Sequence, residues 1–140
     1  MARLPQAVIV HPVLVTLLIV PVVMGCCIVA AVLRPAEVGF VSSSGDYKVE
    51  YVDAKLFFTF RDLAYLKITE QKHPERVFRS PLIAANSLEM NQLENSQYVG
   101  VDWVRFDKMK HRFEIVILGW HGSVMSAFIS NTPYVVFSNE

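Results

Sequence analysis

Residues 7–33 read AVIVHPVLVTLLIVPVVMGCCIVAAVL and contain no Asp, Glu, Lys or Arg. All 13 acidic residues of the chain follow this run, beginning with Glu37. As a helix, the stretch from Val13 to Leu33 would be about 32 Å long at ~1.5 Å per residue, which matches a bilayer hydrocarbon core of ~30 Å. A surface helix of a soluble protein shows a polar stripe at a period near 3.6, and this stretch has none. The sequence therefore predicts a transmembrane helix, with residues 7–33 in contact with the lipid bilayer.

Two other interpretations of the same run stay open. A cleaved signal peptide has a shorter apolar core of ~7–15 residues and a small-x-small cleavage site, which residues 30–33, Ala-Ala-Val-Leu, do not provide. A bacterial lipoprotein signal would be cleaved before a lipidated Cys26, since residues 23–26, Val-Met-Gly-Cys, loosely resemble a lipobox. Met24 fits that motif poorly, and the chain stays apolar after it. We favour an uncleaved anchor, in which Cys26 and its neighbour Cys27 act as small apolar side chains.

Two prolines and one histidine interrupt the apolar run. Pro12 and Pro21 each remove a backbone donor, which a membrane helix tolerates when neighbouring groups satisfy the freed carbonyl. They predict either a bent anchor or a helix that packs through Pro12, Pro21 and Gly25 within a larger membrane complex. An ionisable side chain inside a membrane is a functional candidate, but His11 is so near the amino end that we expect it at the interface.

The charges that flank the run predict its orientation. Arg3 and the α-amino group precede it, whereas Arg34 and Lys48 follow it with Glu37 and Asp46 between them. The positive-inside rule therefore favours a cytoplasmic amino terminus and a domain outside the cytoplasm, which is the periplasm if the cell is bacterial. Both cysteines lie within the apolar run, so the domain needs no reducing environment.

Residues 35–140 are expected to form the working part of the chain. Residues 35–46 contain glycines and three consecutive serines, which are typical of a flexible tether. We therefore divide the chain into a transmembrane anchor (1–34), a tether (35–46) and a domain outside the cytoplasm (47–140). The last part is close to the commonest size of a single domain, ~100 residues.

Alternation of apolar and polar residues predicts most of the domain to be strands. The strand-like segments are 47–51, 56–60, 64–69, 97–107, 111–119, 124–129 and 134–137. For residues 53–71 a helix is the alternative, because Asp53 could cap it and apolar residues would share one face. Residues 80–93 predict a short or broken helix beginning at Ser80-Pro81.

Residues 97–107 and 111–119 predict the clearest hairpin of the chain. Because short connections between strands do not allow parallel crossovers, antiparallel pairing is expected to dominate the sheet. The predicted fold class is α+β: an N-terminal transmembrane helix followed by a small domain dominated by antiparallel β-sheet with one short helix.

The sequence lacks the common motifs of cofactor and metal sites. It has no glycine-rich phosphate loop, no HExxH zinc motif and no GxSxG nucleophile turn. His73, His111 and His121 have no spacing typical of metal ligands. A net charge of zero also argues against nucleic acid as a partner. We therefore expect no cofactor, no metal and no nucleic acid.

The segment Gly119–Ser123, GWHGS, is the first candidate site. A Trp and a His between two glycines predict an exposed turn where a ligand can approach the backbone. Trp120 could cover the edge of the core, or Trp120, His121 and Ser123 could contact a partner, because Trp is enriched among interface anchors. A hydrolytic triad of His121, Ser123 and Asp102 is the third interpretation.

The segment Arg105–Arg112, RFDKMKHR, is the second candidate site. Its basic residues are Arg105, Lys108, Lys110 and Arg112. They could form a solvated turn in which lysines discourage aggregation of sheet edges. Alternatively, they could contact anionic lipid headgroups or an acidic partner.

These features predict a membrane-anchored, non-enzymatic protein-binding domain at the cell envelope. A subunit of a membrane complex, or an immunity or inhibitor-type protein, would have this organisation. The expected partner is a protein at the membrane surface, because tethering raises the effective concentration of the domain toward its neighbours. The alternative is a small membrane-anchored hydrolase that uses His121 and its neighbours.

Overall fold

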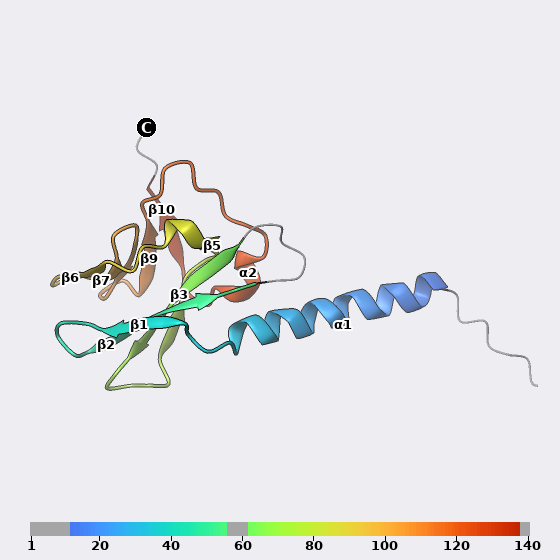
Figure 1. Cartoon of the computed structure of the whole chain (residues 1–140), viewed down its shortest axis with the longest axis horizontal. Coiled ribbons are helices and arrows are strands. Elements are labelled where there is room, and N and C mark those ends of the chain that lie inside the picture. The colour runs from blue at the N-terminus through green and yellow to red at the C-terminus, as the bar shows by residue number, and fades with distance from the viewer. Residues whose placement is uncertain (1–11, 56–61, 138–140) are drawn as a thin grey trace, which may run out of the picture.

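The structure is a computed structural model, and it describes residues 12–55 and 62–137. One long helix projects from a domain built of ten short strands and one short helix (Figure 1). The elements in chain order are α1 (Pro12–Val32), β1 (Val38–Val41), β2 (Tyr47–Asp53), β3 (Leu63–Glu70), β4 (Val77–Arg79), β5 (Ile83–Ala84), the 3-10 turn η1 (Ala85–Ser87), β6 (Gln92–Glu94), β7 (Tyr98–Val101), β8 (Val104–Asp107), β9 (Arg112–Ile115), α2 (Ser126–Ile129) and β10 (Tyr134–Val136). His11 and the strand predicted at 56–60 lie outside the described residues.

Helix α1 confirms the helix predicted from the apolar run. It is 21 residues long, contains Pro21 in its interior, and is long and apolar enough to cross a membrane. Ala31, in its last turn, is the one residue of α1 that is buried. The chain therefore carries a single candidate membrane span within the described residues, with its end against the domain.

The first sheet contains β1 to β5. Strands β1, β2, β3 and β4 follow one another in space, and β5 pairs with the opposite end of β3 from β4. All of these pairs are antiparallel. Strand β3 shows that the helix considered for residues 53–71 does not form over 63–70. Residues 38–41, which we expected within a flexible tether, instead form β1, because their backbone pairs with β2.

The second sheet contains β6 to β10 in the order β10-β9-β8-β7-β6. The strand predicted over 97–107 is wrong as a single strand, because the chain reverses after Val101 and β8 pairs back onto β7. The predicted pairing across residues 108–111 is confirmed by β8 and β9. Strand β10 pairs with β9 in parallel, whereas the other strand pairs of the described residues are antiparallel, so the prediction of a predominantly antiparallel domain is confirmed. The long connection that carries α2 provides the crossover that a parallel pair needs.

Two segments differ in secondary structure from the prediction, one predicted as a helix and one predicted as a strand. Residues 80–93, predicted as a short or broken helix, contain β5, η1 and β6. Residues 124–129, predicted as a strand, contain α2, so the one short helix of the domain lies there. In each case pairing or burial against distant residues decides the conformation, because intrinsic propensity is a weak preference that tertiary contacts override.

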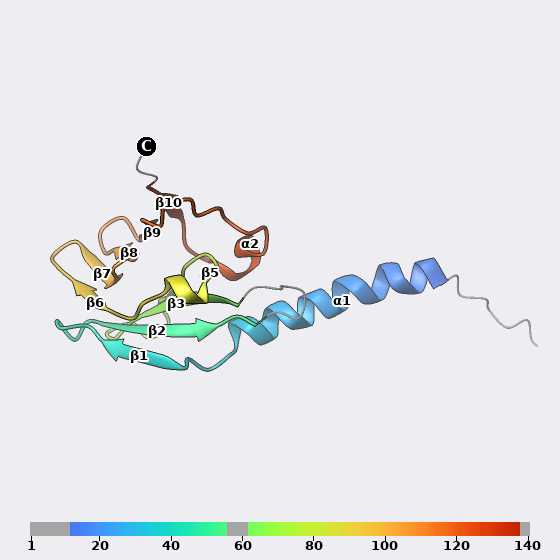
Figure 2. The same cartoon turned by 45° about the horizontal axis from the view of Figure 1, so that its top comes forward.

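The two sheets pack face to face around an apolar core, which we name the inter-sheet core (Figure 2). Phe106 and Phe113 from the second sheet are its largest side chains, with ring centroids 5.2 Å apart. The first sheet contributes alternate residues of β3. The buried members are Val49, Ala64, Leu66, Ile68, Ile83, Leu88, Val99, Val101, Val104, Phe106, Phe113 and Ile115.

The other face of the first sheet packs against the end of α1 and against α2. We name this second apolar cluster the helix junction; its buried members are Ala31, Val52, Ala54, Tyr65, Leu82 and Ile129. Tyr65 Oη donates hydrogen bonds to the carbonyls of Ala31 (3.1 Å) and Val32 (3.4 Å). The last carbonyls of a helix lack partners within the helix. Tyr65 therefore supplies the missing donor and joins α1 to β3.

Candidate functional site

A large surface hollow surrounds the predicted Gly119–Ser123 site. It consists of two adjoining parts of about 590 and 310 Å³, which share Ser87, Ile117 and Leu118. We name it the Trp120 cleft. Its lining residues are Leu63, Leu82, Ala84, Asn86, Ser87, Glu89, Trp103, Ile117, Leu118, Gly119, Trp120, His121 and Ser123. The cleft is therefore formed by four separate parts of the chain, of which the sequence analysis identified only the last as a candidate site.

Trp120 lies against the core and forms one wall of the cleft. It is half-buried, packs against the inter-sheet core and meets Tyr134 edge to face, with ring centroids 5.7 Å apart. The chain turns at Gly119, whose φ of +68° is favourable for glycine. This geometry agrees with a Trp that covers the edge of the core, while its exposed part faces the cleft.

Apolar side chains are exposed around the same cleft. Leu118 is 74% exposed and Trp103 is 47% exposed, and both line it. Val124, which directly follows the lining residue Ser123, is 83% exposed. Clustered apolar surface of this kind marks interaction sites, whereas single exposed apolar residues are ordinary. The cleft thus combines an apolar rim with the polar groups of Ser87, His121 and Ser123.

His121 and Ser123 share the cleft, but Asp102 does not line it. The Asp102 carboxylate accepts a hydrogen bond from Asn91 Nδ2 at 3.2 Å. Ser123 Oγ accepts a hydrogen bond from the amide of Met125 at 3.2 Å. Among the hydrogen bonds of the described residues, none connects His121 with Ser123 or Asp102. The structure therefore brings together two members of the predicted triad without the contacts that nucleophile activation requires.

The basic residues of the second predicted site have partners within the chain. Lys108 Nζ lies 3.0 Å from the Glu94 carboxylate and 2.8 Å from the carbonyl of Asn95. Arg112 pairs with Glu114 at 3.2 Å, and Arg105 Nε donates to the Asp102 carbonyl at 3.4 Å. These cations are therefore already engaged, which weakens their availability to an outside ligand.

The turn between β8 and β9 is held by Asp107, whose side chain is fully buried. Its Oδ1 accepts hydrogen bonds from the amides of Met109 and Lys110, both at 2.9 Å, and its Oδ2 accepts one from Gln97 at 3.2 Å. Burial opposes ionisation of Asp107, but these hydrogen bonds outweigh it and lower the pKa of the carboxyl group. Lys110 alone of the four predicted cations extends far into solvent, with 56% of its side chain exposed.

Glu94 connects the two sheets at the end opposite α1. Its carboxylate accepts hydrogen bonds from the Ser44 hydroxyl (2.6 Å) and amide (2.9 Å), in the β1–β2 turn, and from Lys108 in the β8–β9 turn. Burial raises the pKa of Glu94, but the bonds from Ser44 and Lys108 prevail and hold it at about 2. We name this arrangement the Glu94 clamp. It assigns Lys108 a structural role.

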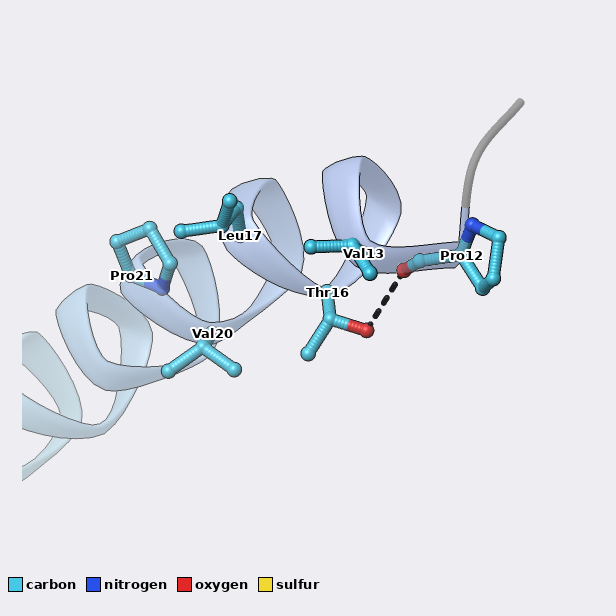
Figure 3. Close-up of a pocket in the computed structure, with 6 residues that line it drawn as sticks. All are labelled: Pro12, Val13, Thr16, Leu17, Val20 and Pro21. Atoms are coloured by element: carbon cyan, nitrogen blue, oxygen red, sulfur yellow. Dashed lines mark hydrogen bonds between the residues drawn. The ribbon is translucent and has the colours of Figure 1, made fainter.

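Helix α1 carries a shallow apolar groove along its amino-terminal half (Figure 3). The groove is lined by Pro12, Val13, Thr16, Leu17, Val20 and Pro21. Thr16 Oγ1 donates a hydrogen bond to the carbonyl of Pro12 at 2.9 Å, so its polar group is satisfied within the helix. Pro12 and Pro21 thus face the same groove, as packing of α1 within a complex would require, while Gly25 lies outside it.

The described residues contain no cluster arranged to hold a metal ion. Over residues 12–55 and 62–137, no group of three or more His, Cys, Asp and Glu side chains has that geometry. The chain matches no protein-family model, no curated protein and no solved structure. Function is therefore inferred from the cleft, the helix and their chemistry.

Proposed function

We propose that this chain is a membrane-anchored, non-enzymatic protein that binds another protein at the membrane surface through the Trp120 cleft. The observation that carries the proposal is the exposure of the apolar lining residues Leu118 and Trp103 in a hollow that also contains hydrogen-bonding groups. Protein interfaces combine such apolar centres with a polar surround, and Trp is enriched among their anchors. The expected partner inserts apolar side chains between Trp103 and Trp120.

The anchor supports the same proposal. A single apolar helix holds the domain at the bilayer, which confines it to a thin layer and raises its effective concentration toward neighbouring membrane proteins. The charges flanking residues 7–33 favour a domain outside the cytoplasm. We therefore place the partner at the outer side of the cell envelope membrane, in the periplasm if the cell is bacterial. A subunit of a membrane complex and an inhibitor or immunity-type protein both fit this arrangement.

Site-specific photocross-linking tests the proposed cleft. The full-length protein would carry a benzophenone amino acid in place of Leu118 and would be irradiated in its own membranes. We expect a discrete cross-linked product with one partner protein. Met109 is the matched control, because it is 82% exposed and lies on the β8–β9 turn away from the cleft. Equal cross-linking from positions 109 and 118, or none from 118, would contradict the proposal.

A small hydrolase is the second candidate, because His121 and Ser123 line one cleft. The two candidates differ in their response to His121→Ala. A hydrolase would lose turnover of its substrate, whereas a binding protein would keep the cross-link from position 118 with a modest change in affinity. Loss of a measurable hydrolytic activity in the membrane fraction upon this substitution would favour the enzyme.

A further inference from the structure

A second apolar groove lies where α1 meets the domain. It has a volume of about 320 Å³, within the ~300–1,000 Å³ typical of small-ligand sites. Its apolar wall comes from the last turns of α1: Val22, Val23, Cys26, Cys27, Ala30 and Ala31. Two cations complete the lining, Arg34 from the segment after α1 and Lys55 from the segment after β2. The groove is therefore apolar along the helix and positively charged beside the domain.

The position of the two cations matches the level of lipid headgroups. The apolar surface of α1 continues to Leu33, which is 76% exposed. Arg34 is the first charged residue after it. A bilayer that covers this apolar surface therefore changes from acyl chains to headgroups at Arg34, where basic side chains meet lipid phosphates.

Nearby carboxylates partly neutralise Lys55, and Asp53 is the one in direct contact with it. Lys55 Nζ lies 3.3 Å from the Asp53 carboxylate and keeps 65% of its side chain exposed. Arg34 Nη1 donates a hydrogen bond to the Asp53 main-chain carbonyl at 3.4 Å. Arginine has five N–H donors and the lysine ammonium has three, so both retain donors for a further acceptor. Both charged residues of the lining are cations. The carboxylates of Asp53, Asp62 and Glu37, which act on Lys55, are not among the lining residues, so a ligand in the groove meets the two positive groups directly, which favours an anionic ligand.

We propose that this groove binds one anionic glycerophospholipid. Its phosphate lies between Arg34 and Lys55, and an acyl chain lies along Val22, Cys26 and Ala30. The inference rests on the membrane anchoring proposed above and deepens it by naming the lipid class that α1 selects. Because Arg34 follows α1 and Lys55 follows β2, the bound lipid also connects the helix to the domain and holds the domain in a fixed orientation on the membrane.

Lipid retention by the intact protein tests this site. The full-length chain would be placed in nanodiscs of equal parts phosphatidylcholine and phosphatidylglycerol, released into mild detergent and analysed by native mass spectrometry. We expect one phosphatidylglycerol to be retained in about threefold preference over phosphatidylcholine, since basic residues near the membrane surface attract anionic lipids and the carboxylates around Lys55 offset part of that attraction. The double variant Arg34→Gln/Lys55→Gln should abolish the preference. The control Lys72→Gln/Arg76→Gln removes two exposed cations of the β3–β4 turn and should keep it.

A second pair of variants separates the groove from general charge attraction. Ala30→Trp fills the apolar wall and leaves both cations in place, so it should displace the retained lipid. Val29→Trp adds the same bulk at a residue that does not line the groove and should leave retention unchanged. Full retention in Ala30→Trp, or a protein chain retained in place of lipid, would overturn the site. An inserted chain without lipid preference would overturn the site alone, whereas a chain that does not insert into nanodiscs would overturn the anchor and this inference together.

Discussion

Strand β3 separates two apolar clusters that differ in construction. On one face, Ala64, Leu66 and Ile68 join the inter-sheet core, whose buried members come from both sheets. On the other face, Tyr65 meets α1 and α2 at the helix junction, a smaller cluster with one buried residue from the long helix. The first cluster maintains the domain, and the second sets how the domain is attached to α1. Their disruption should therefore have different consequences, since proteins open both globally and in local units.

Each of the two apolar clusters also has a polar contact at its edge. The Glu94 clamp joins the turns of the two sheets across the end of the inter-sheet core, and the Tyr65 hydroxyl closes the helix junction. Apolar burial supplies most of the free energy of folding, but it has no direction. The polar contacts fix relative position, because a hydrogen bond weakens steeply when its geometry changes.

Truncation of the inter-sheet core should have the largest effect. We expect Phe106→Ala to lower the free energy of unfolding by about 3–5 kcal/mol, since it leaves a cavity among fully buried side chains. Thermal unfolding of the full-length protein in detergent, followed by Trp fluorescence, would measure the change. Phe128→Ala is the control, because Phe128 is 52% exposed on α2. If Phe106→Ala lowered the free energy of unfolding no more than Phe128→Ala does, the inter-sheet core would not be the main source of the stability of the domain.

Removal of the Glu94 charge should have an intermediate, pH-dependent effect. The pKa of Glu94 is about 2 in the folded protein, below the ordinary value of 4.5. A depressed pKa stabilises the fold above the ordinary value, and this stabilisation is lost as the pH falls from about 4.5 to 2. We expect Glu94→Gln to cost about 1–3 kcal/mol at neutral pH and to reduce the loss of stability in that pH window.

Acid titration of the unfolding free energy in detergent would measure both effects. Glu89→Gln removes an exposed carboxylate near the same strand and should leave the pH profile unchanged. If the unfolding free energies of Glu94→Gln and of the unsubstituted protein fell by the same amount between pH 4.5 and 2, the Glu94 clamp would not be the source of the acid sensitivity.

The features predictable from the sequence are those with a local cause. The extent of α1 follows from an uninterrupted apolar run, and β3 follows from alternation over Ala64–Thr69 together with its aromatic and β-branched residues. The turn after Asp107 is also local, because its carboxylate accepts amides two and three residues later. The fold class and the position of Trp120 in an exposed turn could be inferred for the same reason.

The features that escaped prediction depend on residues far apart in the chain. Residues 38–41 contain glycine beside a serine-rich turn, and only pairing with β2 makes them a strand. Residues 124–129 are predicted as a strand, yet they contain α2, whose Ile129 packs with Ala31 of α1 in the helix junction. The cleft also depends on residues far apart in the chain, because β3 and β5 line it together with residues 117–123. The pairing of Lys108 with Glu94 is likewise not a local contact. No local periodicity encodes them, so the basic segment appeared more available than its ion pairs allow.

Loss of the Tyr65 hydroxyl should have the smallest effect and the most local one. Tyr65→Phe keeps the ring in the helix junction and removes the donor to the Ala31 and Val32 carbonyls. We expect a cost of about 0.5–1.5 kcal/mol, the net value of one hydrogen bond. Because the inter-sheet core is untouched, this loss should appear as local opening at the end of α1 rather than as a lower global stability.

Hydrogen exchange would distinguish local opening from global unfolding. In Tyr65→Phe, amides of the last turn of α1, such as the Leu33 amide bonded to the Val29 carbonyl at 3.0 Å, should exchange up to about tenfold faster, as ~1.4 kcal/mol implies. Amides of β8 and β9 should keep their parent rates. Tyr134→Phe removes a partly exposed hydroxyl away from the junction and should leave α1 unaffected. Faster exchange in both sheets would show that the two clusters unfold as one unit, and unchanged exchange at Leu33 would show that ring packing alone holds the helix to the domain.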